Sequence, residues 1–383
     1  MRYRRLGRTG LEVSEIGLGG EWLERHNTQE CLDVIKRCED RGINILDCWM
    51  SEPNVRSNIG LGIKENRGRW IVQGHIGSTW QNGQYTRTRE MEHVVPAFED
   101  LLTRLQTDYL DLGMIHYVDT EKEWEYIQES PYLEYVFDLK DKGVIRHIGL
   151  STHNPLIALK AARCGYVEML MFSVNPAFDM LPPNDDLESY YLNLTEVEGG
   201  LSGIAPERAE LYSLCESEDI GLTVMKGYAG GRLFSAETSP FGVALTPVQC
   251  LHYALTRPAV ASVLVGYDTP EHVDEAVHYE DATDEEKDYA TVLANAPRHS
   301  ASGQCTYCGH CKPCPMDIDI AMVNKLYDLA SMHEEIPGSV RDHYLSLEHK
   351  AGECIGCRGC EERCPFGVEI ADRMEKTAGL FSE

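Results

Sequence analysis

The sequence predicts an α/β fold, a (β/α)₈ barrel followed by a small domain of helices and loops. Residues 1–285 alternate short apolar runs with amphipathic stretches, a pattern typical of parallel strands joined by helices. There are eight such units, the number that closes a barrel of this kind. Residues 286–383 differ in composition because they are rich in cysteine. We therefore expect two domains that divide at 285/286.

The predicted strands are short and mostly apolar. In chain order they are 15–20, 43–47, 70–74, 108–116, 144–151, 167–172, 220–226 and 261–266. Helical patterns lie between them, most clearly at 28–42, 91–105 and 132–143. An open doubly wound sheet is the main alternative, but GLGGEWL after the first strand lacks the GxGxxG spacing of that fold. The sequence therefore favours the closed barrel.

Two further segments have a predicted role around the barrel. Residues 1–14 have the pattern of a hairpin with RTG as its turn, and such a hairpin can close the bottom of a barrel. The connection at 177–205 is unusually long. Long connections are often lids or substrate loops, and a tolerated surface insertion is the equal alternative.

Charge narrows the choice of partners. The chain has 62 Asp and Glu against 35 Lys and Arg, a net charge of −27. Such a surface repels phosphate backbones and anionic membranes, so we expect neither nucleic acid nor membrane as a partner. We find no apolar run as long as a membrane helix and no secretory signal at the start. The sequence therefore predicts a cytoplasmic location.

Eight of the fourteen cysteines form two runs between 305 and 364. The first run is CTYCGHCKPCP and the second is CIGCRGCEERCP, and a proline follows the fourth cysteine of each. Runs of this spacing bind [4Fe–4S] clusters. Structural zinc sites prefer two separated CxxC pairs, which fits less well. The segment resembles a bacterial two-cluster ferredoxin with a spacer of about 40 residues between its halves.

The spacing also predicts how the cysteines divide between two clusters. Three closely spaced thiolates can hold one face of a cubane, and the fourth, beyond the run, reaches the other cluster. Cluster one is expected to use Cys305, Cys308, Cys311 and Cys364. Cluster two is expected to use Cys354, Cys357, Cys360 and Cys314.

Polar residues follow five of the predicted strands. They are Asp47, His75, His116, Ser151 and Lys226. In a (β/α)₈ barrel the chemistry takes place at the carboxyl ends of the strands, so we expect Asp47, His75 and His116 to share one pocket as catalytic residues. A buried structural histidine is the alternative for His116.

Several stretches, in the same order along the chain, resemble landmarks of the aldo/keto reductase superfamily. They are MRYRRLGRTGLEVSEIGLGG, GINILD, DYLDLGMIHYVD, VIRHIGLSTHN and SVLVGYDTPEHV, and the resemblance spans about residues 1–280. The cysteine-rich extension resembles a bacterial and archaeal branch of that superfamily with a C-terminal ferredoxin-like domain. The resemblance implies a (β/α)₈ barrel and two-electron carbonyl or alcohol chemistry with a nicotinamide.

The family's site consists of Asp, Tyr, Lys and His, with Tyr as the general acid. Asp47 and His116 match the Asp and His landmarks, whereas the place of the Tyr falls on Glu52 and that of the Lys on or beside His75. Ordinary aldehyde reduction by this mechanism should therefore be weak. His75, His116 or Glu52 could supply a proton instead, and the chemistry could be a carbon–carbon double-bond reduction, an elimination or an epimerisation.

The resemblance also implies where NAD(H) or NADP(H) would bind. The residues expected to contact the dinucleotide are Ser151, Lys226, Gly266 and Thr269. Thr269 and Pro270 have the pattern of a helix start, which can receive a phosphate. Four acidic residues follow Gly266, at 268, 271, 274 and 275. They favour NAD(H) over NADP(H), unless they simply form a solvated helix face.

Two hypotheses about function follow. In the first, the chain is an iron–sulfur oxidoreductase that couples electrons from two [4Fe–4S] clusters, a nicotinamide, or both to reduction or redox-linked rearrangement of a small organic substrate. An external ferredoxin or another redox protein would then be its electron partner. In the second, the barrel is a non-catalytic scaffold or electron-carrier subunit, as the missing Tyr and Lys suggest.

Overall fold

The computed structural model describes residues 1–188, 190–191, 203–296 and 303–382, and its main feature is a closed barrel of eight parallel strands. The barrel strands are β3 (Ile16–Gly19), β4 (Ile45–Cys48), β5 (Ile71–Ile76), β8 (Leu110–Ile115), β9 (Ile145–Thr152), β10 (Met169–Ser173), β11 (Gly221–Met225) and β12 (Val260–Gly266). Each strand pairs with the next in sequence, and β12 pairs with β3 to close the ring. All eight predicted strands and the predicted fold class are confirmed.

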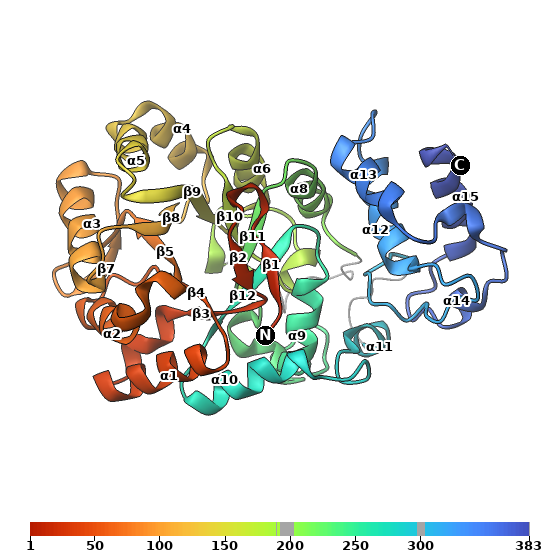
Figure 1. The fold of residues 1–383 in the computed structure, drawn as a ribbon, viewed down its shortest axis with the longest axis horizontal. Helices are drawn as coiled ribbons and strands as arrows, with labels where there is room; N and C mark the ends of the chain where they lie inside the picture. The colour runs from red at the N-terminus through yellow and green to blue at the C-terminus, as the bar shows by residue number, and fades with distance from the viewer. Residues whose placement is uncertain (189, 192–202, 297–302, 383) are drawn as a thin grey trace.

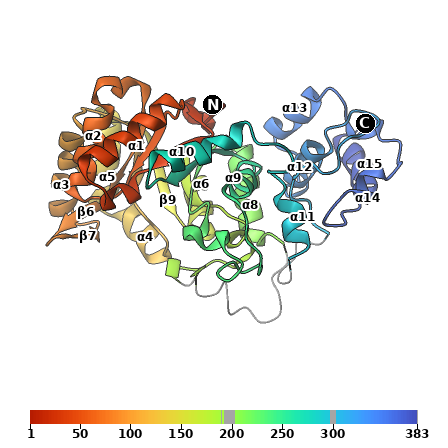
Figure 2. The same cartoon turned by 90° about the horizontal axis from the view of Figure 1, so that it is seen from below.

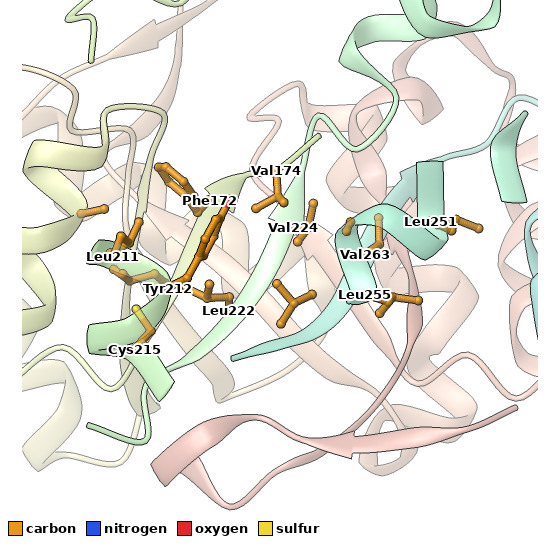
Figure 3. Close-up of a cluster of buried hydrophobic side chains, with 14 of the residues drawn as sticks. Phe172, Val174, Leu211, Tyr212, Cys215, Leu222, Val224, Leu251, Leu255 and Val263 are labelled. Atoms are coloured by element: carbon orange, nitrogen blue, oxygen red, sulfur yellow. The ribbon is translucent and has the colours of Figure 1, made fainter. Parts of the chain in front are cut away.

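Helices surround the barrel (Figures 1 and 2). They are α1 (Thr28–Asp40), α2 (Pro53–Ile63), α3 (Met91–Leu105), α4 (Glu121–Glu129), α5 (Pro131–Asp141), α6 (Pro155–Arg163), α8 (Pro206–Ser217), α9 (Pro247–Leu255) and α10 (Pro270–Val277). Many begin with proline, whose fixed φ suits a first helical turn. Figure 3 shows how α8 and α9 bury apolar side chains against β10, β11 and β12, with Leu211, Tyr212, Leu251 and Leu255 facing Phe172, Leu222, Val224 and Val263.

A hairpin closes the amino-terminal end of the barrel, as predicted. Strands β1 (Tyr3–Arg5) and β2 (Glu12–Ser14) pair antiparallel, and Leu6 and Val13 pack into the barrel interior against side chains such as Leu112. Gly7 has a φ of +49°, and a Cβ there would lie 2.2 Å from the backbone nitrogen of Gly221. Only glycine allows the hairpin to approach the barrel this closely.

A second hairpin, which we did not predict, follows β5. Strands β6 (Ser78–Gln81) and β7 (Gln84–Arg87) are joined by Asn82 and Gly83, with φ values of 54° and 79°. Asn-Gly is the strongest short signal of a two-residue hairpin turn, so the sequence did contain the clue. Because β5 ends at the mouth of the barrel, the hairpin brings Tyr85 to that mouth.

The C-terminal part of the chain is a small domain of helices and loops. It contains α11 (Tyr289–Ala294), α12 (Ile320–Ser331), α13 (Gly338–Ser346), α14 (Gly359–Glu362) and α15 (Ile370–Phe381). Each Cys-Pro pair is followed by a residue in the left-handed region, Asp317 or Gly367, and then by a helix, α12 or α15. The two halves of the domain therefore share the same local backbone pattern. Tyr344 and Phe381 stack at 3.8 Å in its core.

This domain lies beside α8 and α9 (Figures 1 and 2), and both α12 and α13 contact α8. Arg257, which is buried, donates to the carbonyl of Thr306, and the Tyr289 hydroxyl donates to the same carbonyl at 2.6 Å. Tyr289 also packs edge-on against Tyr253 of α9 at 5.2 Å. Helix α11 is thus attached to the barrel, and the division at 285/286 stays a prediction.

The long connection begins with a buried ion pair. Asp179 accepts hydrogen bonds from Arg208 and from the hydroxyls of Tyr212 and Tyr253. This network fixes the start of the connection against α8 and α9. Residues 189 and 192–202, on which the choice between lid and insertion mainly depends, lie outside the described part of the chain. Within the described residues, no helix combines the length and apolarity needed to cross a membrane.

Candidate active site and cluster sites

Asp47, His75 and His116 come together at the mouth of the barrel. They lie on or directly after the neighbouring strands β4, β5 and β8, and all three are buried. His75 Nε2 is 2.8 Å from Asp47 Oδ1, and His75 Nδ1 is 2.8 Å from His116 Nδ1. The residues that the sequence indicated as one pocket are therefore joined by hydrogen bonds.

Two residues that sequence reasoning missed extend this chain of contacts. The Gln73 side chain donates to Asp47 Oδ1 at 3.1 Å from inside the barrel. The Tyr85 hydroxyl lies 2.7 Å from His116 Nε2. Within the described residues, the second oxygen of Asp47 has no hydrogen-bond partner. Strand alternation could have indicated Gln73, because it lies two residues before His75 and faces the same side.

Aromatic side chains enclose the histidine. Trp49 stacks on His116 with ring centroids 5.9 Å apart, and Tyr85 meets Trp49 edge-on at 5.2 Å. Burial, together with the neighbouring His75 and Arg89, holds the pKa of His116 well below its usual value. Burial also raises the pKa of Tyr85 to about 12. His116 is therefore a neutral imidazole and Tyr85 a neutral phenol near pH 7.

Glu52 occupies the place of the family's tyrosine but has a different task. It is the N-cap of α2, where its Oε2 accepts from the Val55 N–H at 2.7 Å. Its Oε1 accepts from the Asn54 side chain at 2.9 Å. Because both oxygens are engaged at the helix start, the geometry favours a structural role for Glu52.

Ser151 and Lys226 lie at the carboxyl ends of β9 and β11. The Ser151 hydroxyl accepts from the Tyr117 N–H at 2.7 Å, so its own hydrogen remains available to donate. Lys226 has a φ of 59°, and its Nζ is 3.7 Å from a Glu21 oxygen. Both side chains thus lie at the same end of the barrel as the histidine pair.

Gly266 and Thr269 lie after β12 at that same end. A Cβ at Gly266 would lie 2.1 Å from the indole of Trp22, so glycine is required there by a close side chain. Thr269 is the N-cap of α10, and Pro270 opens the helix. The predicted helix start is confirmed.

Arg37 in helix α1 and Arg41 just after it partly neutralise the acidic residues of this segment. Asp274 pairs with Arg37 and Arg41, and Asp268 lies 3.2 Å from a nitrogen of His26. The segment from 266 to 279 has no arginine of its own, but the fold brings two to it. The repulsion of a 2′-phosphate is therefore weaker than the sequence suggested.

One hollow in the C-terminal domain contains the four cysteines expected for cluster two. It is lined by Cys314, Cys354, Cys357 and Cys360 together with apolar residues such as Ile318 and Met374. In the described part of the chain, no three His, Cys, Asp or Glu side chains converge on a point that could hold a single metal ion. Thiolates that bind a cubane each hold a different iron, so they surround a volume. The donor set therefore fits a cluster.

The other four cysteines lie where the two runs meet. Burial raises the pKa of the Cys308 thiol, and the neighbouring Cys364 adds to that rise. Arg363 donates to the carbonyls of Cys311 and Pro313 at 2.8 and 2.7 Å, which ties the second run to the first. Cys364 thus lies beside the first run, as crossed ligation requires.

Comparisons with known proteins agree with this architecture. The sequence profile described as "Aldo/keto reductase family" matches residues 15–246, and "4Fe-4S dicluster domain" matches residues 300–368. The chain is 27% identical over 275 residues to the uncharacterized oxidoreductase YqkF of Bacillus subtilis, covering 70% of this chain and 87% of that protein. A probable voltage-gated potassium channel subunit beta of Oryza sativa is 29% identical over 126 residues, or 31% of this chain and 38% of that protein.

Solved structures show the same fold. The aldo-keto reductase AKR11C1 of Bacillus halodurans, in its holo form, superimposes with a TM-score of 0.58 at 22% identity. The match covers 75% of this chain and 94% of that one. A putative aldo-keto reductase of Pseudomonas aeruginosa gives a TM-score of 0.53 at 24% identity, covering 73% and 94%.

Proposed function

This chain belongs to the aldo/keto reductase family and carries a C-terminal 4Fe-4S dicluster domain, and we propose that it reduces or rearranges a small organic substrate at the barrel mouth. The observation that carries the proposal is the hydrogen-bonded trio Asp47, His75 and His116, buried where this fold performs its chemistry. Buried titratable groups of this kind cost stability and gather at functional sites.

The trio supplies the proton chemistry that the missing tyrosine and lysine leave open. Reduction of a carbonyl or an activated double bond needs a hydride and a proton, or two electrons and two protons. Asp47 orients His75, which in turn contacts His116, so a proton can be held or moved along this line. We propose Asp47, His75 and His116 as the catalytic residues.

Two [4Fe–4S] clusters would supply single electrons. The crossed sets proposed for them are Cys305, Cys308, Cys311 and Cys364, and Cys354, Cys357, Cys360 and Cys314. Cys357 is exposed and its neighbour Ile355 is 62% exposed, so an external ferredoxin or another redox protein would deliver electrons at cluster two. Cluster one would be held nearer the barrel, because Tyr307, between its proposed ligands Cys305 and Cys308, has its ring 5.3 Å from the guanidinium of Arg257.

A nicotinamide would be held by Ser151, Lys226, Gly266 and Thr269, and when bound it would supply hydride. The Ser151 hydroxyl keeps a hydrogen to donate, Lys226 provides a cation, and α10 begins at Thr269 with the positive end of its dipole. The Ser151 hydroxyl fits the carboxamide of the nicotinamide, and Lys226 and the start of α10 fit a phosphate. All three lie at the same end of the barrel.

A non-catalytic barrel is the second candidate. Glu52 acts as a helix cap where the family has its tyrosine, and relatives include probable channel subunits. The discriminating experiment is an anaerobic titration with NADH and NADPH that follows nicotinamide fluorescence, combined with reduction of glyoxal and 9,10-phenanthrenequinone. We expect nucleotide binding and a turnover that His116→Ala abolishes without loss of iron. Binding of neither nucleotide and no reduction of either probe would support the scaffold.

A further inference from the structure

Four side chains form one uninterrupted line of hydrogen bonds from the barrel interior to the mouth. The heavy-atom distances are 2.8 Å from Asp47 to His75, 2.8 Å from His75 to His116 and 2.7 Å from His116 to Tyr85. The first three residues are buried, whereas Tyr85 is half-buried on β7. The line therefore has one end that a bound molecule could reach, the Tyr85 hydroxyl.

The proton positions in this line follow from its chemistry. A carboxylate only accepts, so His75 must donate to Asp47 through Nε2. A neutral imidazole has one N–H, so His75 Nδ1 must accept from His116 Nδ1. His116 Nε2 must then accept from Tyr85. With both imidazoles neutral, every hydrogen bond points toward Asp47, and the Tyr85 oxygen can only accept a proton from outside.

One added proton reverses the direction of the hydrogen bonds between His75, His116 and Tyr85. If His75 becomes an imidazolium, it donates to Asp47 and to His116 Nδ1 at once. His116 then carries its proton on Nε2 and donates to Tyr85, which frees the Tyr85 O–H to donate outward. His116 stays neutral in both states, in keeping with the low pKa that burial gives it. The extra charge lies on His75 beside the Asp47 carboxylate, where it is stabilised.

We propose that Tyr85 is the catalytic proton donor, fed through His116 and His75, and that it replaces the tyrosine missing from position 52; this rests on the proposed function. In carbonyl reduction, the substrate oxygen takes the Tyr85 proton as the carbonyl carbon receives a hydride, which a bound nicotinamide would supply. Tyr85 takes the proton of His116 Nε2, and His116 takes that of His75 Nδ1. The alkoxide becomes an alcohol and His75 becomes neutral.

Other charged groups face this line. Arg87 and Arg89 come from the hairpin and its end, Glu123 from α4 and His153 from the segment after β9. Both arginines pair with Glu123, at 3.5 and 3.4 Å. The two arginines lower the pKa of Tyr85, against the dominant effect of burial. They therefore ease the departure of its proton without holding it as a phenolate.

Nitrogen-15 NMR of the cluster-loaded protein, with labelled histidine, tests the relay without a substrate. At high pH we expect neutral His75 with Nε2–H and neutral His116 with Nδ1–H. As the pH falls, a single transition should make His75 an imidazolium and move the His116 proton to Nε2. Asp47→Asn should shift this transition to lower pH, because it removes the carboxylate that stabilises the added proton. Tyr117→Phe is the control, because Tyr117 packs on His116 at 6.0 Å outside the line, and it should keep the switch.

Kinetics test the role of Tyr85 as donor. With NADH or NADPH and 9,10-phenanthrenequinone or glyoxal as probes, Tyr85→Phe should lower kcat at least about 100-fold and remove the alkaline limb of the pH profile, the fall in kcat as the relay loses its extra proton. KM and iron content should stay the same. A loss under threefold, or a His116 that becomes an imidazolium itself, overturns the proposal. If the unaltered protein shows the histidine switch but reduces neither probe, the proposed function fails and the relay stands.

Discussion

The barrel mouth and the cluster domain hold their reactive groups in opposite ways. The mouth presents Asp47, His75 and His116 inside the large apolar core of the barrel. The cluster domain arranges eight thiols around a small core in which Tyr344 stacks on Phe381. A small core contributes little stability by itself, and metal binding can supply the remainder. We therefore expect the first site to depend on packing and the second on its cofactor.

Loss of a cluster should therefore have the largest effect. Cys364→Ser should lower the iron content from about eight to about four per chain and remove cluster one, although Cys364 lies in the second run. Hydrogen exchange should accelerate in α12 and α15 while β8 and β9 keep their protection. Cys164→Ser, at a cysteine outside both runs, is the matched control. Intact iron in Cys364→Ser would refute crossed ligation.

A change at the barrel mouth should have the opposite effect, a loss of turnover with the clusters intact. Asp47→Asn keeps the size of the side chain but removes the negative charge that stabilises a protonated His75. We expect turnover of the carbonyl probes to fall about 100- to 1,000-fold, with iron content and cluster spectra unchanged. Gln73→Leu, which keeps the Asp47 carboxylate and removes its second hydrogen bond, should cost less. Equal losses from both changes would indicate a general collapse of the pocket.

The sequence was informative where a pattern repeats and silent where side chains meet from distant elements. Apolar runs indicated the eight strands, and cysteine spacing indicated the set that lines the hollow at Cys314. The contact between Tyr85 and His116 depends on a hairpin that places them 2.7 Å apart, and no local pattern encodes that. Arg37 and Arg41 were missed beside Asp274 for the same reason, because α1 and α10 are far apart in sequence.

The stability of the barrel should also depend on pH. Burial lowers the pKa of His116 and lowers that of His252 to about 4. Below about pH 6.5 the unfolded chain binds protons that the folded barrel does not. The free energy of unfolding of the barrel should then fall by up to about 1.4 kcal/mol per histidine for each pH unit. Urea unfolding of His252→Asn between pH 7 and 5 should show a shallower fall; an unchanged slope would contradict it.

Nucleotide preference should show the smallest effect. We expect NADH to bind more tightly than NADPH, by less than the acidic segment alone would give, because Asp274 is paired with Arg37 and Arg41. Asp274→Asn should free these arginines and bring the two dissociation constants closer together. Fluorescence titration measures both. NADPH binding tenfold tighter than NADH to the unaltered protein would refute the preference.

Reoxidation of reduced clusters tests most directly whether the two regions work together. The protein is reduced anaerobically, freed of reductant and mixed with 9,10-phenanthrenequinone, while cluster absorbance is followed by stopped flow. Our account predicts that the clusters reoxidise rapidly in the unaltered protein and at least about 100-fold more slowly in His116→Ala of equal iron content. Equal rates in both proteins would mean that electrons leave directly from the exposed clusters, which would contradict the account.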